Sequence, residues 1–354
     1  MLKSVTDRLL RWRDRVRRRV AIWWWDRPNR TSGPFQDKIV FIRWDAKLGD
    51  TIVLSWVFRE LKRQRPDLEI VVITGQSFED LFRRGYGINS VYLAGKRHGG
   101  RELKNIVTQL VNSRYVVHLG LRWRPRDIRF VRSLDPEYVV GLDDELEIVN
   151  VKLGVLTESR HFSEKLVPWL EQIAVDTRDR RYWIPRLPDA AVRVDQWWPK
   201  GGVVGLCPYG ASRKRHLTDE QISVMVDSIL SRTGATVLLI GRSDEIEALK
   251  ARLFSATIKQ RVLNHSSDNV FELFEQVARC DAVVSVDTAV VHIAVGAGKR
   301  LLALYADKDE QSQNFRDWRP NAKGAQCLFG QFDSVPLSDG AKADLHGAVQ
   351  RLVV

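Results

Sequence analysis

The stretch Asp281-Ala-Val-Val-Ser-Val-Asp-Thr-Ala-Val-Val-His292 decides the fold of this chain. An apolar run from Ala282 to Val286 ends in Asp287 and Thr288, and helical spacing begins immediately afterwards. The pattern predicts a buried strand that leads directly into a helix, as in parallel α/β sheets. The first turn of such a helix directs backbone N–H groups and the positive end of its dipole at one point. A diphosphate can bind there.

Two side chains of the predicted helix bear on this site. Thr288 and His292 are four residues apart, so both should face the same side of the helix. A simpler interpretation is that Asp287 or Thr288 caps the helix and His292 is a packed core histidine. The segment alone leaves both interpretations open.

The same alternation of strand and helix continues along the chain from Lys38 onward. Strands are expected at 39–43, 69–73, 90–93, 114–118 and 138–140, with a helix at 50–65 and a mostly helical stretch at 154–180. After a break rich in Pro and Gly at 184–202, the alternation resumes at 203. The pattern predicts an α/β protein with two doubly wound, Rossmann-like domains that face a cleft. The expected parts are an arm and linker at 1–34, domains at 35–184 and 202–330, a linker at 185–201 and a helical tail at 331–354.

The composition is consistent with two domains and argues against a disulfide-stabilised or membrane-spanning protein. The chain has 354 residues, 44% of them apolar and 12 of them Trp, which is enough for two cores. Cys207, Cys280 and Cys327 are too few and too scattered for a disulfide framework, and the first two lie in apolar runs typical of buried residues. No apolar run reaches the ~18 residues that span a bilayer, and no export signal is evident.

The net charge of +12 is concentrated at the N-terminus, where residues 1–30 carry +7. Apolar residues there follow helical spacing and form one stripe: Leu2, Val5, Leu9, Trp12, Val16, Val20 and Trp23. A basic amphipathic helix of this kind suits an anionic membrane surface, which residues 1–25 are expected to contact. Docking of the stripe on the protein itself, or on a partner, remains the alternative.

Three further loops follow predicted strands, where ligands bind in open α/β sheets. The first, Arg43-Trp-Asp-Ala-Lys-Leu-Gly-Asp50, ends in a carboxylate that can cap the next helix or accept a proton late in a reaction. The second, Cys207-Pro-Tyr-Gly-Ala-Ser-Arg-Lys-Arg-His216, joins a small-residue turn to cations that suit a diphosphate. The third, Gly241-Arg-Ser-Asp-Glu245, offers Asp244 to a ribose or to a helix N-terminus.

Other chemistries have little support. The chain has no dinucleotide fingerprint after its first strand, no Walker A loop and no nucleophile elbow. Asp307-Lys-Asp309 has the spacing of a metal-binding Asp-x-Asp pair, a pattern that is common by chance, and we expect no metal.

Taken in order, these segments resemble the family-nine glycosyltransferases, the lipopolysaccharide heptosyltransferases. The resemblance extends from about Lys38 to Pro320. It rests on these segments: Arg43 to Asp50, Tyr209 to Ser212 with the following basic residues, Asp287-Thr-Ala-Val-Val-His-Ile-Ala294, and Leu301 to Asp309. Ala289 stands where the family has glycine, and Lys214 and Arg215 both match the region of its single lysine.

The resemblance implies a GT-B fold and inverting transfer of heptose from ADP-heptose to the lipopolysaccharide inner core, with neither metal nor cofactor. The donor would bind the C-terminal half and the acceptor the N-terminal half. Asp50 would be the general base. The resemblance implies that the diphosphate is bound by Ser212, Lys214 or Arg215, Thr288 and His292. It implies that the nucleotide and sugar are bound by Gly210, Asp244, Asp287 and Ala289. On the acceptor side it implies Arg43 and Lys47.

The expected location is therefore peripheral, on the cytoplasmic face of the inner membrane. One alternative is a glycosyltransferase of the same fold that uses another nucleotide sugar in surface polysaccharide assembly. Another is a nucleic-acid-binding protein with a basic arm, although the body shows no nucleic-acid module and we expect no nucleic-acid partner. A third is an inactive scaffold that has kept the fold.

Overall fold

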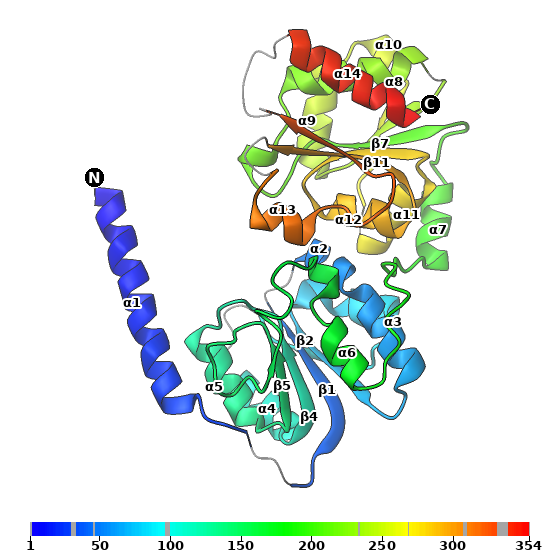
Figure 1. Ribbon diagram of the computed structural model, residues 1–354. Helices are drawn as coiled ribbons and strands as arrows, with labels where there is room; N and C mark the ends of the chain where they lie inside the picture. The colour runs from blue at the N-terminus through cyan, green and yellow to red at the C-terminus, as the bar shows by residue number, and fades with distance from the viewer. Residues whose placement is uncertain are drawn as a thin grey trace. The chain divides into compact units, whose positions relative to one another are not determined.

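The computed structural model describes residues 2–29, 33–44, 47–95, 100–232, 234–267, 269–306, 310–330 and 339–353. The chain divides into two compact units (Figure 1), Met1–Ala46 with Val57–Asp179 and Lys47–Trp56 with Arg180–Val354. Segment Lys47–Trp56 belongs to the second unit, whereas the sequence pattern placed it in the first domain. The reason is that its helix α2 (Leu48–Val53) packs on helix α12 (Ala289–Gly296).

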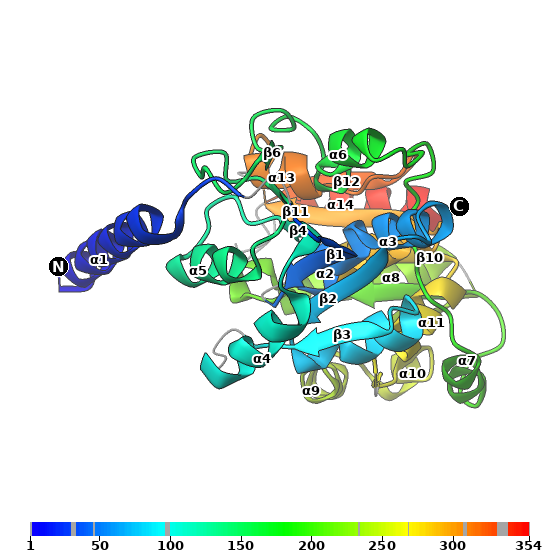
Figure 2. The same ribbon diagram turned by 90° about the horizontal axis from the view of Figure 1, so that it is seen from below.

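The first unit contains a six-stranded parallel sheet in the order β3-β2-β1-β4-β5-β6. Figure 2 shows β1 to β4 side by side. Its strands are β1 (Gln36–Arg43), β2 (Glu69–Thr74), β3 (Ser90–Leu93), β4 (Ser113–His118), β5 (Tyr138–Gly141) and β6 (Val151–Lys152). Its helices are α1 (Leu2–Trp25), α3 (Ser55–Gln64, whose first two residues belong to the second unit), α4 (Gly100–Leu110), α5 (Pro125–Leu134) and α6 (Val167–Gln172), with short turns η1 (Gln76–Phe78), η2 (Leu81–Gly85) and η3 (Phe162–Glu164).

The second unit repeats this topology, with the order β12-β11-β10-β7-β8-β9. Its strands are β7 (Val203–Cys207), β8 (Thr236–Leu239), β9 (Val262–Asn264), β10 (Ala282–Val286), β11 (Arg300–Ala306) and β12 (Gln326–Gly330). Besides α2 and α12, its helices are α7 (Pro188–Asp195), η4 (Arg213–Arg215), α8 (Asp219–Arg232), α9 (Ser243–Leu253), α10 (Ala256–Lys259), α11 (Val270–Arg279), α13 (Gln313–Trp318) and α14 (Asp339–Val353).

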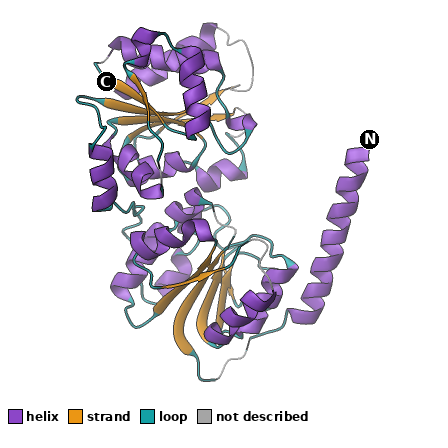
Figure 3. Cartoon of the chain, turned by 180° about the vertical axis from the view of Figure 1, so that it is seen from behind, coloured by secondary structure: helices purple, strands orange, loops and turns teal. Residues whose placement is uncertain are grey.

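Each sheet is covered by helices on both faces, as Figure 3 shows. The central strands are accordingly rich in apolar residues, and every residue of β7 and β10 is buried. The expectation of two doubly wound α/β units is therefore confirmed. Cys207 and Cys280 are free and buried, and burial raises the pKa of the Cys280 thiol to about 12.

Three expectations of secondary structure are wrong. Residues 154–180, expected to be mostly helical, contain only η3 and α6. The expected linker 185–201 contains helix α7, because Pro188 occupies its first turn, where proline initiates a helix rather than breaking it. The expected helix 50–65 is divided at Leu54, and Ser55 there donates to the carbonyl of Ile52 and accepts the N–H of Trp183.

Among the described side chains of helix α1, those that contact the rest of the first unit lie on one face. Arg18 has a buried side chain that donates to Asp143 at 2.9 Å and to Glu145 at 2.7 Å, and Ala21 is 1% exposed. Beyond the helix, Asp26 accepts the N–H groups of residues 147 and 148. In the part of the chain that the structure describes, no helix is long and apolar enough to cross a membrane.

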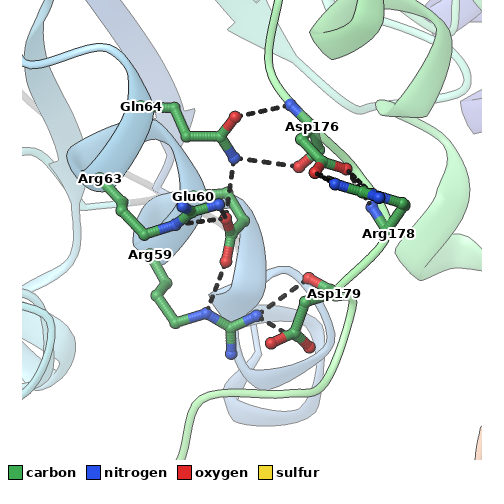
Figure 4. Close-up of polar contacts among 7 residues, drawn as sticks. All are labelled: Arg59, Glu60, Arg63, Gln64, Asp176, Arg178 and Asp179. Carbon is green, nitrogen blue, oxygen red and sulfur yellow. Dashed lines mark hydrogen bonds and ion pairs between the residues drawn. The ribbon is translucent and has the colours of Figure 1, made fainter.

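A polar network replaces the helix expected at the end of the first unit (Figure 4). Gln64 exchanges two hydrogen bonds with the backbone of Asp176, and Arg59 pairs with Asp179 at 3.3 Å. At its centre, Glu60 is 2% exposed and accepts from Arg59, Arg63 and Gln64. Burial by itself would raise the pKa of Glu60, but these hydrogen bonds hold it below its usual value.

Glu60→Gln should lower the unfolding free energy of the first unit by about 1–2 kcal/mol at neutral pH, since two guanidinium groups lose a charged partner. Because the folded-state pKa lies below the unfolded value of 4.5, the carboxylate's contribution is present above that pH and is lost as the pH falls through the folded pKa. The variant should therefore show a flatter decline in stability than the wild type as the pH falls from about 5 to about 3.

Denaturant unfolding at several pH values measures this difference. The control is Glu147→Gln, which removes an exposed carboxylate of the same unit and should keep the wild-type profile. Equal flattening in both variants would contradict the role given to Glu60.

Candidate active site

A pocket of about 800 Å³ lies at the carboxyl ends of the second unit's strands. The strand order reverses direction between β7 and β10, and residues following these two strands line the pocket, among them Tyr209 and Thr288. Such a reversal point is where doubly wound sheets bind their ligands, because the connecting loops diverge there and leave a crevice. The position of the pocket thus follows from the topology.

Four helices of the second unit begin at this pocket. The first residues of α2, α9, α11 and α12 all line it: Leu48, Ser243, Val270 and Ala289. Each helix N-terminus carries a partial positive charge and N–H groups that lack a partner within the helix. The pocket is therefore suited to an anionic ligand even where no charged side chain enters it.

The loop after β7 forms one wall through Tyr209, Gly210 and Ala211. The N–H of Gly210 donates to the carbonyl of Arg215 at 2.9 Å, so the loop folds back on itself. A Cβ atom at Gly210 would lie 2.6 Å from the Cβ of Arg215, which explains the need for glycine. Ser212 precedes the short turn η4 and is exposed.

Of the two candidate cations of this loop, the structure describes the side chain of Arg215 but not that of Lys214. Arg215 pairs with Asp287 at 3.0 Å and also donates to the Asp287 carbonyl, so it ties the loop to the end of β10. Arg215, Asp287 and Ser212 border the pocket loops but are not among its lining residues. The side chain of Lys214 lies outside the described residues, as do Asp307 and Asp309.

Residues of the β10–α12 junction divide between pocket and core. Thr288 is the N-cap of α12, where its hydroxyl accepts the N–H of Val290 at 3.2 Å, and both Thr288 and Ala289 line the pocket. His292, one turn later, is 4% exposed and lies near the rings of Tyr182 and Trp318. The capping interpretation of Thr288 is thus confirmed, and His292 is a packed histidine that does not line the pocket.

Helix α2 carries the Leu-Gly-Asp part of the first motif to the same place. Leu48 lines the pocket, and a Cβ atom at Gly49 would lie 3.1 Å from Cδ2 of His292. Asp50 follows in the first turn, where its carboxylate accepts the N–H of the exposed Lys47 at 3.3 Å. The structure thus brings the first and last motifs together through glycine and histidine. Arg43, at the end of β1, belongs to the first unit and is 8% exposed.

Asp244 lines the pocket from the first turn of α9 and is largely exposed. Arg242 pairs with it at 3.0 Å, and this hydrogen bond lowers the pKa of the Asp244 carboxyl. An ionised carboxylate at this position can accept hydrogen bonds from the hydroxyl groups of a ribose.

One wall of the pocket was missed by the sequence analysis. It follows β9 and includes His265, Ser267 and Asn269, with Gln276 from α11. The ring of His265 stacks on Trp197 with 4.1 Å between centroids, which fixes its orientation. The rule that loops after parallel strands bind ligands applies to β9 as well, so the signal was present in the sequence.

Comparison with known proteins agrees with this geometry. Residues 200–333 match the family model of glycosyltransferase family 9 (heptosyltransferase). This match covers most of the second unit but less than half of the whole chain. No curated protein sequence matches the chain significantly.

Solved structures of glycosyltransferases share the fold of about nine tenths of the chain. E. coli ADP-heptose lps heptosyltransferase II superposes with a TM-score of 0.68 at 15% identity, over 89% of this chain and 98% of that one. The family 9 glycosyl transferase from Veillonella parvula DSM 2008 gives 0.67 at 13% identity, over 91% and 99%. E. coli heptosyltransferase WaaC with ADP-2-deoxy-2-fluoro heptose gives 0.64 at 13%, over 89% and 98%. The chain is a glycosyltransferase with the GT-B fold.

Gly49→Val should lower the unfolding free energy of the second unit by about 1–3 kcal/mol, because the new side chain would press on His292. The control Gly234→Val adds the same side chain where nothing lies within 4 Å of the Cβ position. Combining Gly49→Val with His292→Ala should cost less than the sum of the single changes. Thermal and denaturant unfolding measure these values. Strict additivity would mean that the two residues do not support one another.

Proposed function

We propose that this chain transfers heptose from ADP-heptose to the lipopolysaccharide inner core, with inversion at the anomeric carbon and without a metal ion. The observation that carries the proposal is the pocket at the β7–β10 reversal, onto which four helix N-termini open. The family match and the similarity to E. coli heptosyltransferases II and WaaC support the choice of donor and acceptor.

The pocket is suited to the diphosphate of the donor. In the transfer the bond between the anomeric carbon and the diphosphate oxygen breaks, and its electron pair leaves with the nucleotide. The added negative charge is stabilised by the N-termini of α9, α11 and α12 and by the hydroxyl of Thr288. Arg215, anchored on Asp287, supplies a cation beside the loop, and we keep Ser212 and Lys214 as further contacts.

Asp50 is the proposed general base. It follows Leu48, which lines the pocket, by two residues, and it is partly exposed. As the acceptor hydroxyl attacks the anomeric carbon from the face opposite the diphosphate, its proton becomes acidic and passes to the carboxylate. The hydroxyl oxygen forms the new glycosidic bond, Asp50 holds the proton, and the nucleoside diphosphate departs. His292 has a positioning role, because it supports the turn that carries Asp50.

The membrane placement rests on helix α1. Its stripe residues with described side chains are exposed rather than docked on the protein: Trp12 at 64%, Val16 at 39%, Val20 at 48% and Trp23 at 73%. Such a surface favours insertion into a membrane interface, where a lipid-linked acceptor is found. We therefore propose a peripheral location on the cytoplasmic face of the inner membrane, with Arg43 and Lys47 on the acceptor side.

Asp50→Ala should reduce the transfer rate by about 10²- to 10⁴-fold, the usual contribution of a general base, while ADP binding stays near normal. Asp50→Asn is the matched variant, because its amide oxygen can still accept the Lys47 N–H but cannot take a proton. It should be as inactive as the alanine variant yet as stable as the wild type. A rate above about a tenth of wild type in either variant would show that another group is the base.

A thermal-shift panel of ADP, UDP, GDP and CMP tests the nucleotide. A ligand at about 100 times its dissociation constant adds roughly 2.7 kcal/mol, so ADP should raise the melting temperature by a few degrees. Ala211→Trp, which fills the pocket wall, should abolish the shift, whereas Ala251→Trp on the exposed side of α9 should preserve it. A response to UDP alone would favour the alternative function, a glycosyltransferase of the same fold that uses another nucleotide sugar. If none of the four nucleotides raises the melting temperature, the result would argue against nucleotide binding in the pocket.

A further inference from the structure

A second pocket, of about 630 Å³, lies in the first unit between α1 and the N-terminus of α5. Apart from Asp14, Trp123 and Pro125, its lining is formed by Arg15, Arg17, Arg18, Arg122, Arg124 and Arg126. We call it the arginine pocket. It belongs to neither the donor pocket nor the Asp50 turn, which are in the second unit.

The pocket is built on a rigid frame. Trp123 is 1% exposed, and its backbone N–H donates to the Asp143 carboxylate at 2.7 Å. Arg18 joins α1 to this frame, because it binds Asp143 and Glu145 and also donates to the Trp123 carbonyl. These contacts hold the arginines of α1 and those of the loop before α5 around one space.

Four of the lining arginines carry a positive charge that no carboxylate among the described residues neutralises. Arg15, Arg17, Arg122 and Arg124 are exposed, and none has a carboxylate partner among the described residues. Asp14, the acidic residue of the lining, is paired with Arg13 at 3.0 Å. Cations gathered around one cavity repel one another, and an anion bound among them relieves that repulsion.

The neighbouring surface indicates where the anion comes from. With 100° between successive residues, the exposed stripe Trp12, Val16, Val20 and Trp23 faces away from Arg18, while Arg15 and Arg17 lie between the two faces. A helix lying in a membrane interface with this stripe inserted would hold Arg15 and Arg17 at the depth of the headgroups.

We propose that the arginine pocket binds the phosphomonoester headgroup of a membrane lipid. A phosphomonoester carries a charge of about −1.5 to −2 and three acceptor oxygens, and guanidinium groups bind it in pairs. A phosphodiester headgroup carries a single charge and should bind less well. The inference extends the proposed membrane placement and does not depend on the transfer reaction.

The test is the binding of the full-length chain to phosphatidylcholine vesicles that contain either phosphatidic acid or phosphatidylglycerol, matched for surface charge. We expect a preference of roughly fivefold or more for phosphatidic acid. Arg122→Gln with Arg124→Gln should abolish the preference. Arg19→Gln with Arg27→Gln removes the same charge from exposed positions outside the pocket and should preserve it.

The stripe variant Trp12→Ser with Trp23→Ser separates this inference from the membrane placement. It should weaken binding to both kinds of vesicle alike, and unchanged binding would overturn the placement itself. If the wild type shows no headgroup preference, or if both arginine pairs have equal effects, binding is a matter of net charge and the pocket proposal fails. Glycerol phosphate that binds as tightly as the vesicles would instead indicate a site for a soluble phosphate. An unchanged melting temperature confirms that the arginine variants are folded.

Discussion

The contact between Gly49 and His292 is the constraint on which the proposed active site depends. The chain leaves β1 of the first unit and places α2 on α12 of the second, where an added Cβ at position 49 would lie 3.1 Å from the histidine ring. A side chain at position 49 would require the His292 ring to shift by a few tenths of an ångström, so glycine suits this close approach. As a result, the turn carrying Asp50 begins at the wall of the donor pocket, although about 240 residues separate the two motifs.

The two pockets proposed as anion-binding sites would bind anions by different physical means. The pocket of the second unit is bordered by helix N-termini, and Arg242, the arginine among its lining residues, is already paired with Asp244. Fixed dipoles need no reorganisation when charge develops on a leaving group, which suits a site of chemistry. The arginine pocket uses exposed, flexible cations on a helix that carries an apolar stripe, which suits reversible attachment to a surface.

For helix α1, a tertiary contact decides between two interpretations of a local sequence pattern. The spacing of its apolar residues predicts a stripe, but a stripe of this kind could equally pack on the protein. In the structure the opposite face, with Arg18 and Ala21, contacts the unit, so Trp12 and Trp23 remain exposed. The buried ion pair of Arg18 and the packing of Ala21, Ile22 and Trp25 against the core thus fix the orientation of the helix together.

The local pattern of residues was enough to establish the fold class and most of the strands. An apolar run that ends in Asp287 and Thr288 already specifies a strand, a cap and a helix, since each of these depends on neighbours within a few residues. The same pattern placed Gly210 and Asp244 at a ligand-binding edge.

Other features depend on which elements become neighbours, and only the tertiary structure decides that. Packing of α2 on α12 brought residues 47–56 into the second unit and placed Gly49 beside His292, a proximity that the sequence pattern did not predict. The polar contacts of Arg59 and Gln64 hold residues 176–179 against α3 where a helix was expected. The spacing of apolar residues predicts which face of a helix or strand is buried, but it does not predict the element against which that face packs.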